Sequence, residues 1–148
     1  MTTETESKME LDIIPFVRVG PIYLGAPRAE IRSLLGTRFR SYMKTPASIE
    51  PTDHFLDLDI HVFYKNDSCK GIELFVPNKP TLLGHLIVGR PFSEVVGWLE
   101  SLDPSVDRDT TGLVSRQFGV SVFAPNAKTA IQDPVESVYV FIRGAFGT

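Results

Sequence analysis

The chain has 148 residues, of which 43% are hydrophobic, and this size and composition allow one domain to bury a core without a metal or a disulfide. The net charge of −3 argues against a protein that wraps duplex nucleic acid, because such binding depends on many neutralised phosphates. The one cysteine, Cys69, excludes an internal disulfide and is typical of a reducing cytoplasm.

The N-terminal residues 1–10 are polar and acidic, so we expect them to be disordered. They have neither the basic start nor the apolar run of a signal peptide. No stretch of the chain approaches the roughly 20 apolar residues needed to span a bilayer. We therefore expect a cytoplasmic protein without membrane contact that forms a single domain over residues 1–148.

A block of seven residues occurs twice in the chain. Residues 25–31 read GAPRAEI, and residues 89–95 read GRPFSEV. Two later blocks also recur in the same order: IHVF and IELF in the first half become VSVF and VYVF in the second. Three ordered blocks predict an internal duplication, with repeat 1 at about residues 16–78 and repeat 2 at about residues 82–144.

The first half is expected to begin with strand structure in residues 16–24. Pro27 then suits the first turn of a helix, where its missing N–H costs nothing, and Gly36 supplies a stop. The apolar stripe of this helix is formed by Ile31, Leu34 and Leu35. The polar residues 45–58 are predicted to be a loop, and residues 66–70 a hairpin loop. Three strands are expected at residues 39–44, 59–65 and 71–76.

The second half is expected to follow the same order. Its helix begins at Pro91 and ends at Asp103. The buried side of this helix is predicted to be Phe92, Val95, Val96, Leu99 and Leu102. Residues 126–136 are predicted to be a second long loop, and strands are expected at residues 113–118, 120–124 and 137–143. The predicted fold class is α+β, with two pseudo-symmetric βαβββ repeats, antiparallel sheets and one helix per repeat on the outer face.

Side chains alternate between the two faces of a strand, so each strand predicts a buried and an opposite face. The aliphatic faces are expected to pack under the helices; they comprise Ile60, Val62, Tyr64, Ile72, Leu74, Val76, Val120, Val122, Val138, Val140 and Ile142. The opposite faces carry Phe63, Phe75, Phe123 and Phe141, with His61, Glu73, Ser121 and Tyr139 towards the edge. This aromatic layer is either a second core or an open concavity that accepts a ligand or a partner chain.

Charged residues are unevenly distributed. Residues 28–44 carry five basic residues against one acid, whereas residues 50–59 carry four acids and neither Lys nor Arg. This is either ordinary solvated surface or a pair of patches that orient a protein partner. In the second interpretation the partner-binding residues are acidic: Glu50, Asp53, Asp57, Asp59, Asp103, Asp107, Asp109, Asp133 and Glu136.

No residue pattern indicates catalysis. The three histidines, His54, His61 and His85, have no spacing that predicts a metal site, and nothing near Cys69 in the sequence acts as its base. The recurring Glu30 and Glu94 are explained by their place in the first turn of a helix, where a carboxylate is favoured. We therefore expect no enzyme activity, no catalytic residues, no cofactor and no metal.

Residues 25–36, GAPRAEIRSLLG, resemble the helix start of BamE-like small α+β domains, over about a dozen residues in each half. Members of that family are lipoproteins with a lipidated N-terminal cysteine and a single unit. This chain has no such cysteine and two units, so membrane anchoring does not carry over. By general character the chain also resembles the small acidic immunity proteins encoded beside bacterial polymorphic toxins.

The leading hypothesis is a non-catalytic protein-binding module, an immunity protein that occludes the active surface of a toxin. An acidic surface would suit a basic toxin domain such as a nuclease. One alternative is a small-ligand-binding protein or minor enzyme that uses the aromatic layer, with ligand-binding residues His61, Phe63, Glu73, Phe75, Phe123 and Tyr139. Another is a structural protein that forms a homodimer through an unpaired strand, so the chain is expected to be a monomer or a homodimer.

Overall fold

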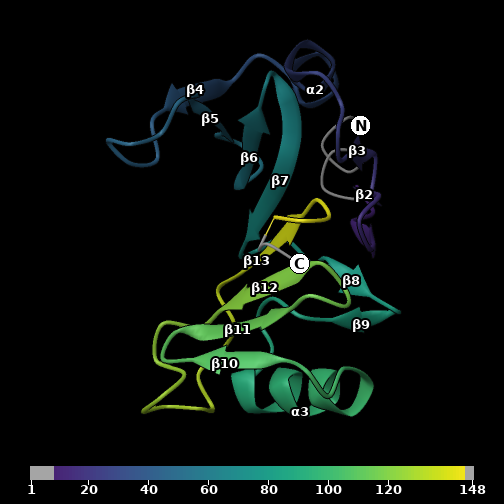
Figure 1. The fold of residues 1–148 in the computed structure, drawn as a ribbon, viewed down its shortest axis with the longest axis vertical. Coiled ribbons are helices and arrows are strands. Elements are labelled where there is room, and N and C mark those ends of the chain that lie inside the picture. Colours follow the sequence, from purple (N-terminus) through teal and green to yellow (C-terminus); the bar gives the residue numbers. More distant parts are fainter. Residues whose placement is uncertain (1–8, 146–148) are drawn as a thin grey trace.

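The computed structural model describes residues 9–145 and shows an α+β fold made mostly of strands (Figure 1). The expected disorder of residues 1–10 concerns residues that are mostly outside this range. The first half contains β1 (Asp12–Ile14), β2 (Arg18–Val19), β3 (Ile22–Tyr23), α2 (Arg28–Leu35), β4 (Phe39–Tyr42), β5 (Thr52–Phe55), β6 (Ile60–Lys65) and β7 (Ser68–Phe75). The second contains β8 (Thr81–Leu82), β9 (His85–Leu86), α3 (Phe92–Leu102), β10 (Asp107–Asp109), β11 (Gly112–Ser115), β12 (Val120–Phe123) and β13 (Ser137–Phe141).

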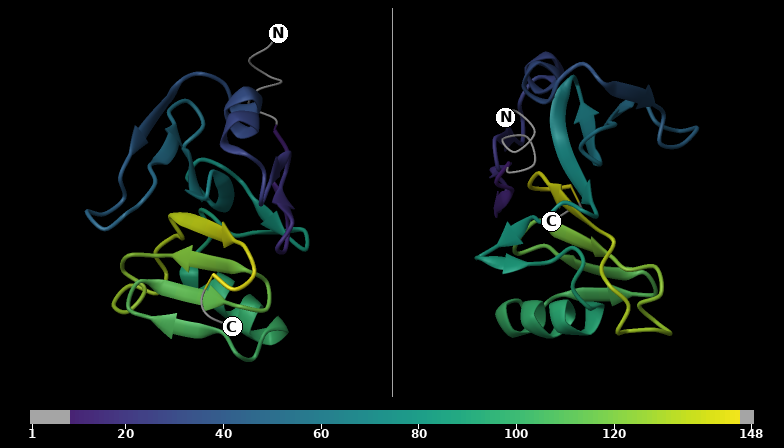
Figure 2. Two further views of the ribbon diagram at one scale, coloured as in Figure 1. Left: turned by 45° about the horizontal axis from the view of Figure 1, so that its top comes forward. Right: turned by 180° about the vertical axis from the view of Figure 1, so that it is seen from behind.

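These strands form two sheets. The large sheet has eight antiparallel strands in the order β10-β11-β12-β13-β7-β6-β5-β4, so the last strand of each half meets the other at the centre. The small sheet has the order β3-β2-β1-β8-β9, and only its β1–β8 pair is parallel. The views of Figure 2 show β4 to β7 with α2 in one half of the molecule and β10 to β13 with α3 in the other.

The core lies on one face of the large sheet. One hydrophobic cluster joins Ile13 of the small sheet, Ile31 of α2 and Leu99 of α3 to Ile72 and Val140 of the large sheet. Polar contacts anchor both helices to the same face: Arg32 bonds to Asp53 of β5, and Asp103 at the end of α3 accepts from Ser115 of β11. The two helices and the small sheet therefore cover one face of the large sheet.

The helix limits predicted from the sequence are confirmed. Pro27 and Pro91 precede α2 and α3, and Gly36 ends α2 with a φ of 103°, which side-chain-bearing residues rarely adopt. The predicted apolar stripes were each wrong at one residue. Leu34 is 48% exposed because it borders a cavity, and Leu102 at the last residue of α3 is 38% exposed. Neither helix in residues 9–145 has the length and apolar character that crossing a membrane requires.

Each helix is followed by four strands, so the predicted three were wrong by one strand in each half. β5 lies inside the predicted loop 45–58, and β10 lies between α3 and the first strand expected there. The predicted hairpin loop at residues 66–70 is only a two-residue turn. Its residues Asn66 and Asp67 have φ angles of 53° and 66°, as the tightest hairpin turns require. Cys69 therefore lies within β7, where it is buried.

The predicted aliphatic face is confirmed over most of its length. Its eight central members are at most 2% exposed: Ile60, Val62, Ile72, Leu74, Val120, Val122, Val138 and Val140. Tyr64 is also buried. Val76 was assigned wrongly, because it lies beyond the end of β7 at a cis Val76–Pro77 bond and is 49% exposed. Ile142, beyond the end of β13, is only partly buried.

Candidate functional site

The face of the large sheet opposite the helices, here called the open face, carries a row of paired residues that crosses all eight strands. From β4 to β10 the row consists of Arg40, His54, His61, Glu73, Tyr139, Ser121, Val114 and Asp107. Directly paired residues of antiparallel strands share a face, so these side chains lie side by side. Every member of the row is at least partly exposed, whereas on the six inner strands the core-facing residues beside them are buried. The row therefore runs along an uncovered surface.

The four phenylalanines of this face have two different environments. Phe63 and Phe141 are 4% and 2% exposed, whereas Phe123 is 37% exposed and Phe75 is partly exposed. Tyr139 packs edge-on against Phe63, with ring centroids 5.3 Å apart, and also lies 6.0 Å from Phe141. The aromatic layer is thus a second core in one part and an exposed surface in the other, and binding at the exposed part stays a prediction.

Gly71 makes room for the buried part of this layer. A Cβ atom at Gly71 would stand 2.2 Å from the Tyr139 hydroxyl and 2.4 Å from its ring. The pairing of Phe63 with Gly71 and of Gly71 with Phe141 leaves space in which Tyr139 lies flat across the sheet. The absence of a side chain at Gly71 therefore allows the position of Tyr139, which is a member of the exposed row.

A cluster of aromatic rings surrounds His61 on the other half of the open face. The Tyr42 hydroxyl lies 2.7 Å from His61 Nδ1, and the His54 and His61 rings are stacked at 4.1 Å. The Phe75 ring lies 5.0 Å from His61 on the remaining side. Burial, together with repulsion from His54, lowers the pKa of His61 to about 4. His61 is therefore neutral near pH 7 and is a weak base for proton transfer at that pH.

We expect the free energy of unfolding to fall as the pH is lowered from about 7 to about 4. In the unfolded chain His61 has an ordinary pKa of 6.5 and binds a proton that the folded state does not, so protonation favours unfolding within this interval. Because the ring is partly accessible to solvent, we expect a loss of about 1–2 kcal/mol rather than the full value of the shift. Urea unfolding at several pH values between about 4 and about 7 measures this change in the free energy of unfolding.

His61→Gln should flatten this pH dependence, and His85→Gln, which changes an exposed histidine of β9, should leave it unchanged. The assignment to His61 would be wrong if both variants kept the slope of the wild type. Below pH 4 other groups contribute. Burial by itself would raise the pKa of Asp53, but hydrogen bonds from Arg32, Ser41 and Tyr64 hold that pKa below its ordinary value.

The cysteine and the buried tyrosine are not arranged for nucleophilic chemistry. Cys69 is 1% exposed, its thiol lies 3.7 Å from the Gly71 carbonyl oxygen, and burial raises the pKa of this thiol to about 12. The Tyr64 hydroxyl donates to Asp53 at 3.0 Å, and burial raises the pKa of Tyr64 far above its ordinary value. A nucleophile needs a lowered pKa and a group that takes its proton, and the pKa of each of these side chains is raised. The Asp53 carboxylate beside Tyr64 is already occupied by hydrogen bonds from Arg32 and Ser41.

Two of the nine acidic residues expected to bind a partner lie inside the molecule. Asp53 and Asp103 have no exposed surface. Asp53 accepts hydrogen bonds from Arg32 and Tyr64, and Asp103 accepts one from Ser115. Neither carboxylate can contact a partner, so their assignment to a binding surface was wrong. The physical reason is that donors distant in the sequence, Arg32 of α2 and the hydroxyl groups of Tyr64 and Ser115, fill the hydrogen-bonding positions of these carboxylates.

Three more of these acids form ion pairs within the chain. The pairs are Glu50 with Arg28, Asp57 with Arg38, and Asp107 with Arg116. The remaining four come from three separate segments and are Asp59, Asp109, Asp133 and Glu136. The structure therefore does not gather the nine acids into one surface, and the basic residues of 28–44 neutralise much of the acidic insert.

The structure adds Arg40 and His54 to the residues of the open face. Sequence reasoning placed His54 in a loop, because residues 45–58 are rich in Pro, Ser, Thr and Asp. The signal that identifies the strand is its period of two, in which Asp53 and Phe55 face the core and His54 faces outwards beside His61.

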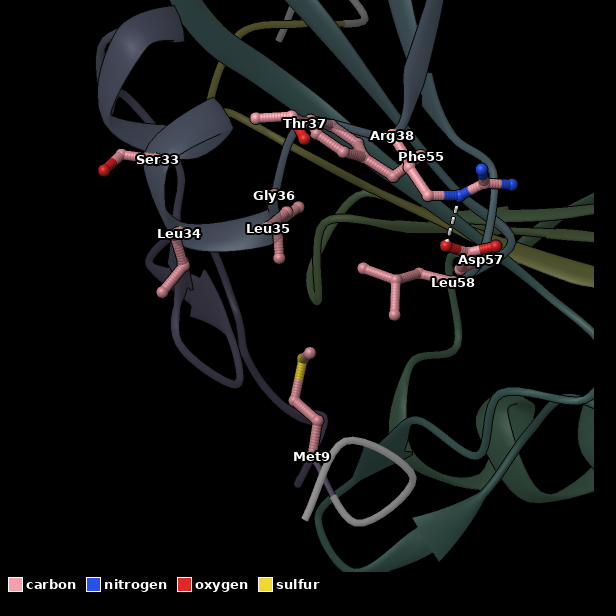
Figure 3. A pocket seen from close by; sticks show the side chains of 10 residues that line it. All are labelled: Met9, Ser33, Leu34, Leu35, Gly36, Thr37, Arg38, Phe55, Asp57 and Leu58. Atoms are coloured by element: carbon pink, nitrogen blue, oxygen red, sulfur yellow. Dashed lines mark hydrogen bonds and ion pairs between the residues drawn. The ribbon is translucent and has the colours of Figure 1, made fainter. Parts of the chain in front are cut away.

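A separate cavity of about 600 Å³ lies beside the C-terminal end of α2 (Figure 3). The side chains of Met9, Leu35 and Leu58 point towards a common space in this view. Arg38 and Asp57 border the cavity and pair with each other at 2.7 Å. The cavity thus presents apolar walls, and the charged groups of its lining are already paired.

Residues 9–145 contain no group of three or more His, Cys, Asp or Glu side chains arranged to hold a metal ion. No protein-family model, curated protein or solved structure matches the chain.

Proposed function

We propose that this chain is a non-catalytic protein-binding module and that its contact surface is the open face of the large sheet. The observation that carries the proposal is the row of partly exposed residues across all eight strands, with Phe123 and Phe75 beside it. Aromatic and arginine side chains contribute most to binding energy when a partner excludes water from them. A sheet face in contact with water alone does not favour large aromatic rings.

The chemistry of the face supports binding rather than catalysis. His61 is held neutral and already contacts Tyr42, and the thiol of Cys69 lies on the buried side with a raised pKa. The tyrosines and histidines retain an apolar body and a polar group, a combination that is enriched at protein interfaces. These residues therefore suit contact with another protein.

The biological role predicted from the sequence, neutralisation of a toxin by occlusion of its active surface, stays a prediction. Its physical requirement is a rigid face large enough to cover a functional surface, and an eight-stranded sheet packed on two helices meets this requirement. The electrostatic argument for a basic toxin is weaker than the sequence indicated, because five of the nine acids are buried or paired.

One edge strand of the large sheet disfavours edge-to-edge dimerisation. β10 is one edge of the large sheet, and its three residues, Asp107, Arg108 and Asp109, are charged and exposed. Charged side chains on an edge strand oppose pairing with a second chain. A homodimer through β10 is therefore less well supported than a contact through the open face.

We also propose that the two halves arose by internal duplication. Each helix is preceded by a hairpin and followed by four antiparallel strands. Gly25 and Gly89 have similar φ angles, 90° and 86°, two residues before Pro27 and Pro91. A homologous chain with one unit that assembles as a dimer would support this origin, and homologues that never carry both blocks would contradict it.

The proposed function is tested by affinity capture from the native host with matched variants. The face variant combines His54→Ala with Phe123→Ser. The control combines His85→Ala with Leu83→Ser, which makes the same kinds of change on the small sheet, where Leu83 is 61% exposed. We expect wild type and control to capture the same stoichiometric protein, and the face variant to recover it at least about ten-fold less. Equal recovery by all three, or recovery of the chain alone, would contradict the proposal.

A further inference from the structure

Four cationic side chains gather at one end of the open face. This basic patch consists of Lys44, Lys65, Lys70 and Arg143, all of which are exposed. Among the residues that the structure describes, none of the four forms an ion pair with a carboxylate. Lys44 Nζ lies 4.5 Å from the centre of the Phe63 ring, and the Arg143 guanidinium lies 4.1 Å from that of Phe16. Lys44 thus rests on the buried part of the aromatic layer, and Arg143 rests on Phe16, whose ring packs edge-on against Phe141 of that layer.

An irregularity in the β6–β7 pairing places two of these lysines together. Phe63 pairs with Gly71 and Tyr64 pairs with Cys69, so Lys70 has no partner in the register. Such an irregularity redirects a side chain relative to the regular alternation of the strand. Lys70 lines the same two cavities as Lys65, the last residue of β6.

The basic patch lines two neighbouring cavities, here called the cationic hollows, and Lys65 and Lys70 line both of them. One, of about 360 Å³, is lined by Lys44, Lys65 and Lys70 together with Phe63. The other, of about 280 Å³, is lined by Lys65, Lys70 and Arg143 together with Tyr139. Each hollow therefore combines three cations with one ring of the aromatic layer.

The nearest carboxylates do not neutralise this charge. Glu50 lines the larger hollow, but it accepts hydrogen bonds from the backbone N–H groups of Asn66 and Asp67 and pairs with Arg28 at 3.0 Å. The side chain of Asp67 pairs with Arg28 as well, at 2.7 Å. Arg28 thus offsets the charge of Asp67, and the backbone N–H groups of Asn66 and Asp67 hold Glu50, so the patch keeps its positive charge.

We propose that the basic patch binds the carboxylates of an acidic segment of the partner protein, with one acidic side chain in each hollow. This inference rests on the proposed function, because it assigns a charge to the partner of the open face. Lysine is a compact point charge that suits single carboxylates approaching from different directions. The sequence indicated a basic partner, because the acids of residues 50–59 look unpaired in the sequence. In the folded chain Glu50, Asp53 and Asp57 pair with arginines, so this argument for a basic partner is lost.

The distribution of charge favours a protein over a nucleic acid. Binding to a phosphate backbone needs cations along an extended track, because each neutralised phosphate adds to affinity. Here the cations are confined to one end of the face, and the row ends with Asp107 and contains Glu73. A long polyanion would meet these carboxylates, whereas a short acidic segment would contact the patch alone.

The test titrates the full chain with a ten-residue peptide rich in glutamate, followed by NMR at low salt. The patch variant Lys65→Glu/Lys70→Glu is compared with Lys79→Glu/Lys128→Glu, which changes the net charge equally at two exposed lysines outside the patch. We expect shifts at Lys65, Lys70 and Gly71, and binding at least about ten-fold weaker in the patch variant only. Equal weakening in both variants, no binding to wild type, or tighter binding of a ten-nucleotide oligothymidylate would overturn the inference.

A second arm separates this inference from the proposed function. The patch variant is used in the same affinity capture as the face variant. Capture that is lost with both variants supports the acidic partner. Capture that persists with the patch variant and is lost with the face variant would overturn the acidic partner and leave the proposed function intact. Peptide binding without any captured protein would contradict the proposed function and, with it, the assignment of the acidic segment to a partner.

Discussion

Replacing Asp53 with alanine is expected to lower the free energy of unfolding by about 3–5 kcal/mol. The carboxylate has no exposed surface and is held by Arg32 through two hydrogen bonds, at 2.8 and 2.9 Å. Ser41 and Tyr64 donate to it at 2.7 and 3.0 Å. Its removal leaves the Arg32 guanidinium and the Tyr64 hydroxyl without this acceptor, and an unpaired group of this kind costs more than the bond itself contributes.

The effect should be large because Asp53 joins four elements: α2, β4, β5 and β6. Burial by itself would raise the pKa of Asp53, but the hydrogen bonds from Arg32, Ser41 and Tyr64 hold that pKa below its ordinary value. The charged form therefore stabilises the fold at neutral pH.

Urea unfolding followed by circular dichroism measures the change, and Asp57→Ala is the matched control. Asp57 also pairs with an arginine, but both side chains of that pair are more than 60% exposed, so we expect a loss below about 1 kcal/mol. Similar losses in the two variants would show that the buried network contributes little.

Phe63→Ser is expected to destabilise the chain by about 3–5 kcal/mol, whereas Phe123→Ser should cost about 1 kcal/mol or less. The two residues lie at matching places of the repeated blocks, yet Phe63 is 4% exposed and Phe123 is 37% exposed. Removal of the Phe63 ring leaves a space under Tyr139 and Lys44 and buries a hydroxyl in it. Thermal unfolding of the two variants under identical conditions gives the comparison.

This pair also separates the two roles of the aromatic layer. Phe123→Ser should keep the fold and weaken partner capture, while Phe63→Ser should weaken both through loss of folded protein. A Phe123→Ser chain that fails to fold would place Phe123 in the core, and the open face would then lose one of its contact residues.

The helix starts and the buried strand faces were predictable because they depend on neighbours close in sequence. Proline at the first turn and glycine after the last act within a few residues, and aliphatic residues at every second position mark a buried face. α2 and α3 begin as expected, and Ile72, Leu74, Val138 and Val140 are buried as expected. Local pattern was sufficient for these features.

β5 was not predictable by the same reasoning. Its four residues include Asp53 and His54, which are unfavourable in an isolated strand. Asp53 is tolerated because Arg32 reaches it from α2, and His54 because His61 of the neighbouring strand stacks on it. Both partners are specified by tertiary packing, so a polar segment became an internal strand of the sheet, next to the edge strand β4.

By itself, then, the sequence determined the α+β class, the helix limits and the aliphatic core face, since each follows from side-chain periodicity and backbone preference. Only the tertiary structure decided which charges stay free, because Arg28, Arg32 and Arg38 neutralise acids about twenty or more residues away. The same holds for the open face, whose row of residues comes from eight strands in a register that no local signal specifies. The acidic insert that the sequence indicated became structural, and the basic patch appeared where three separate segments meet.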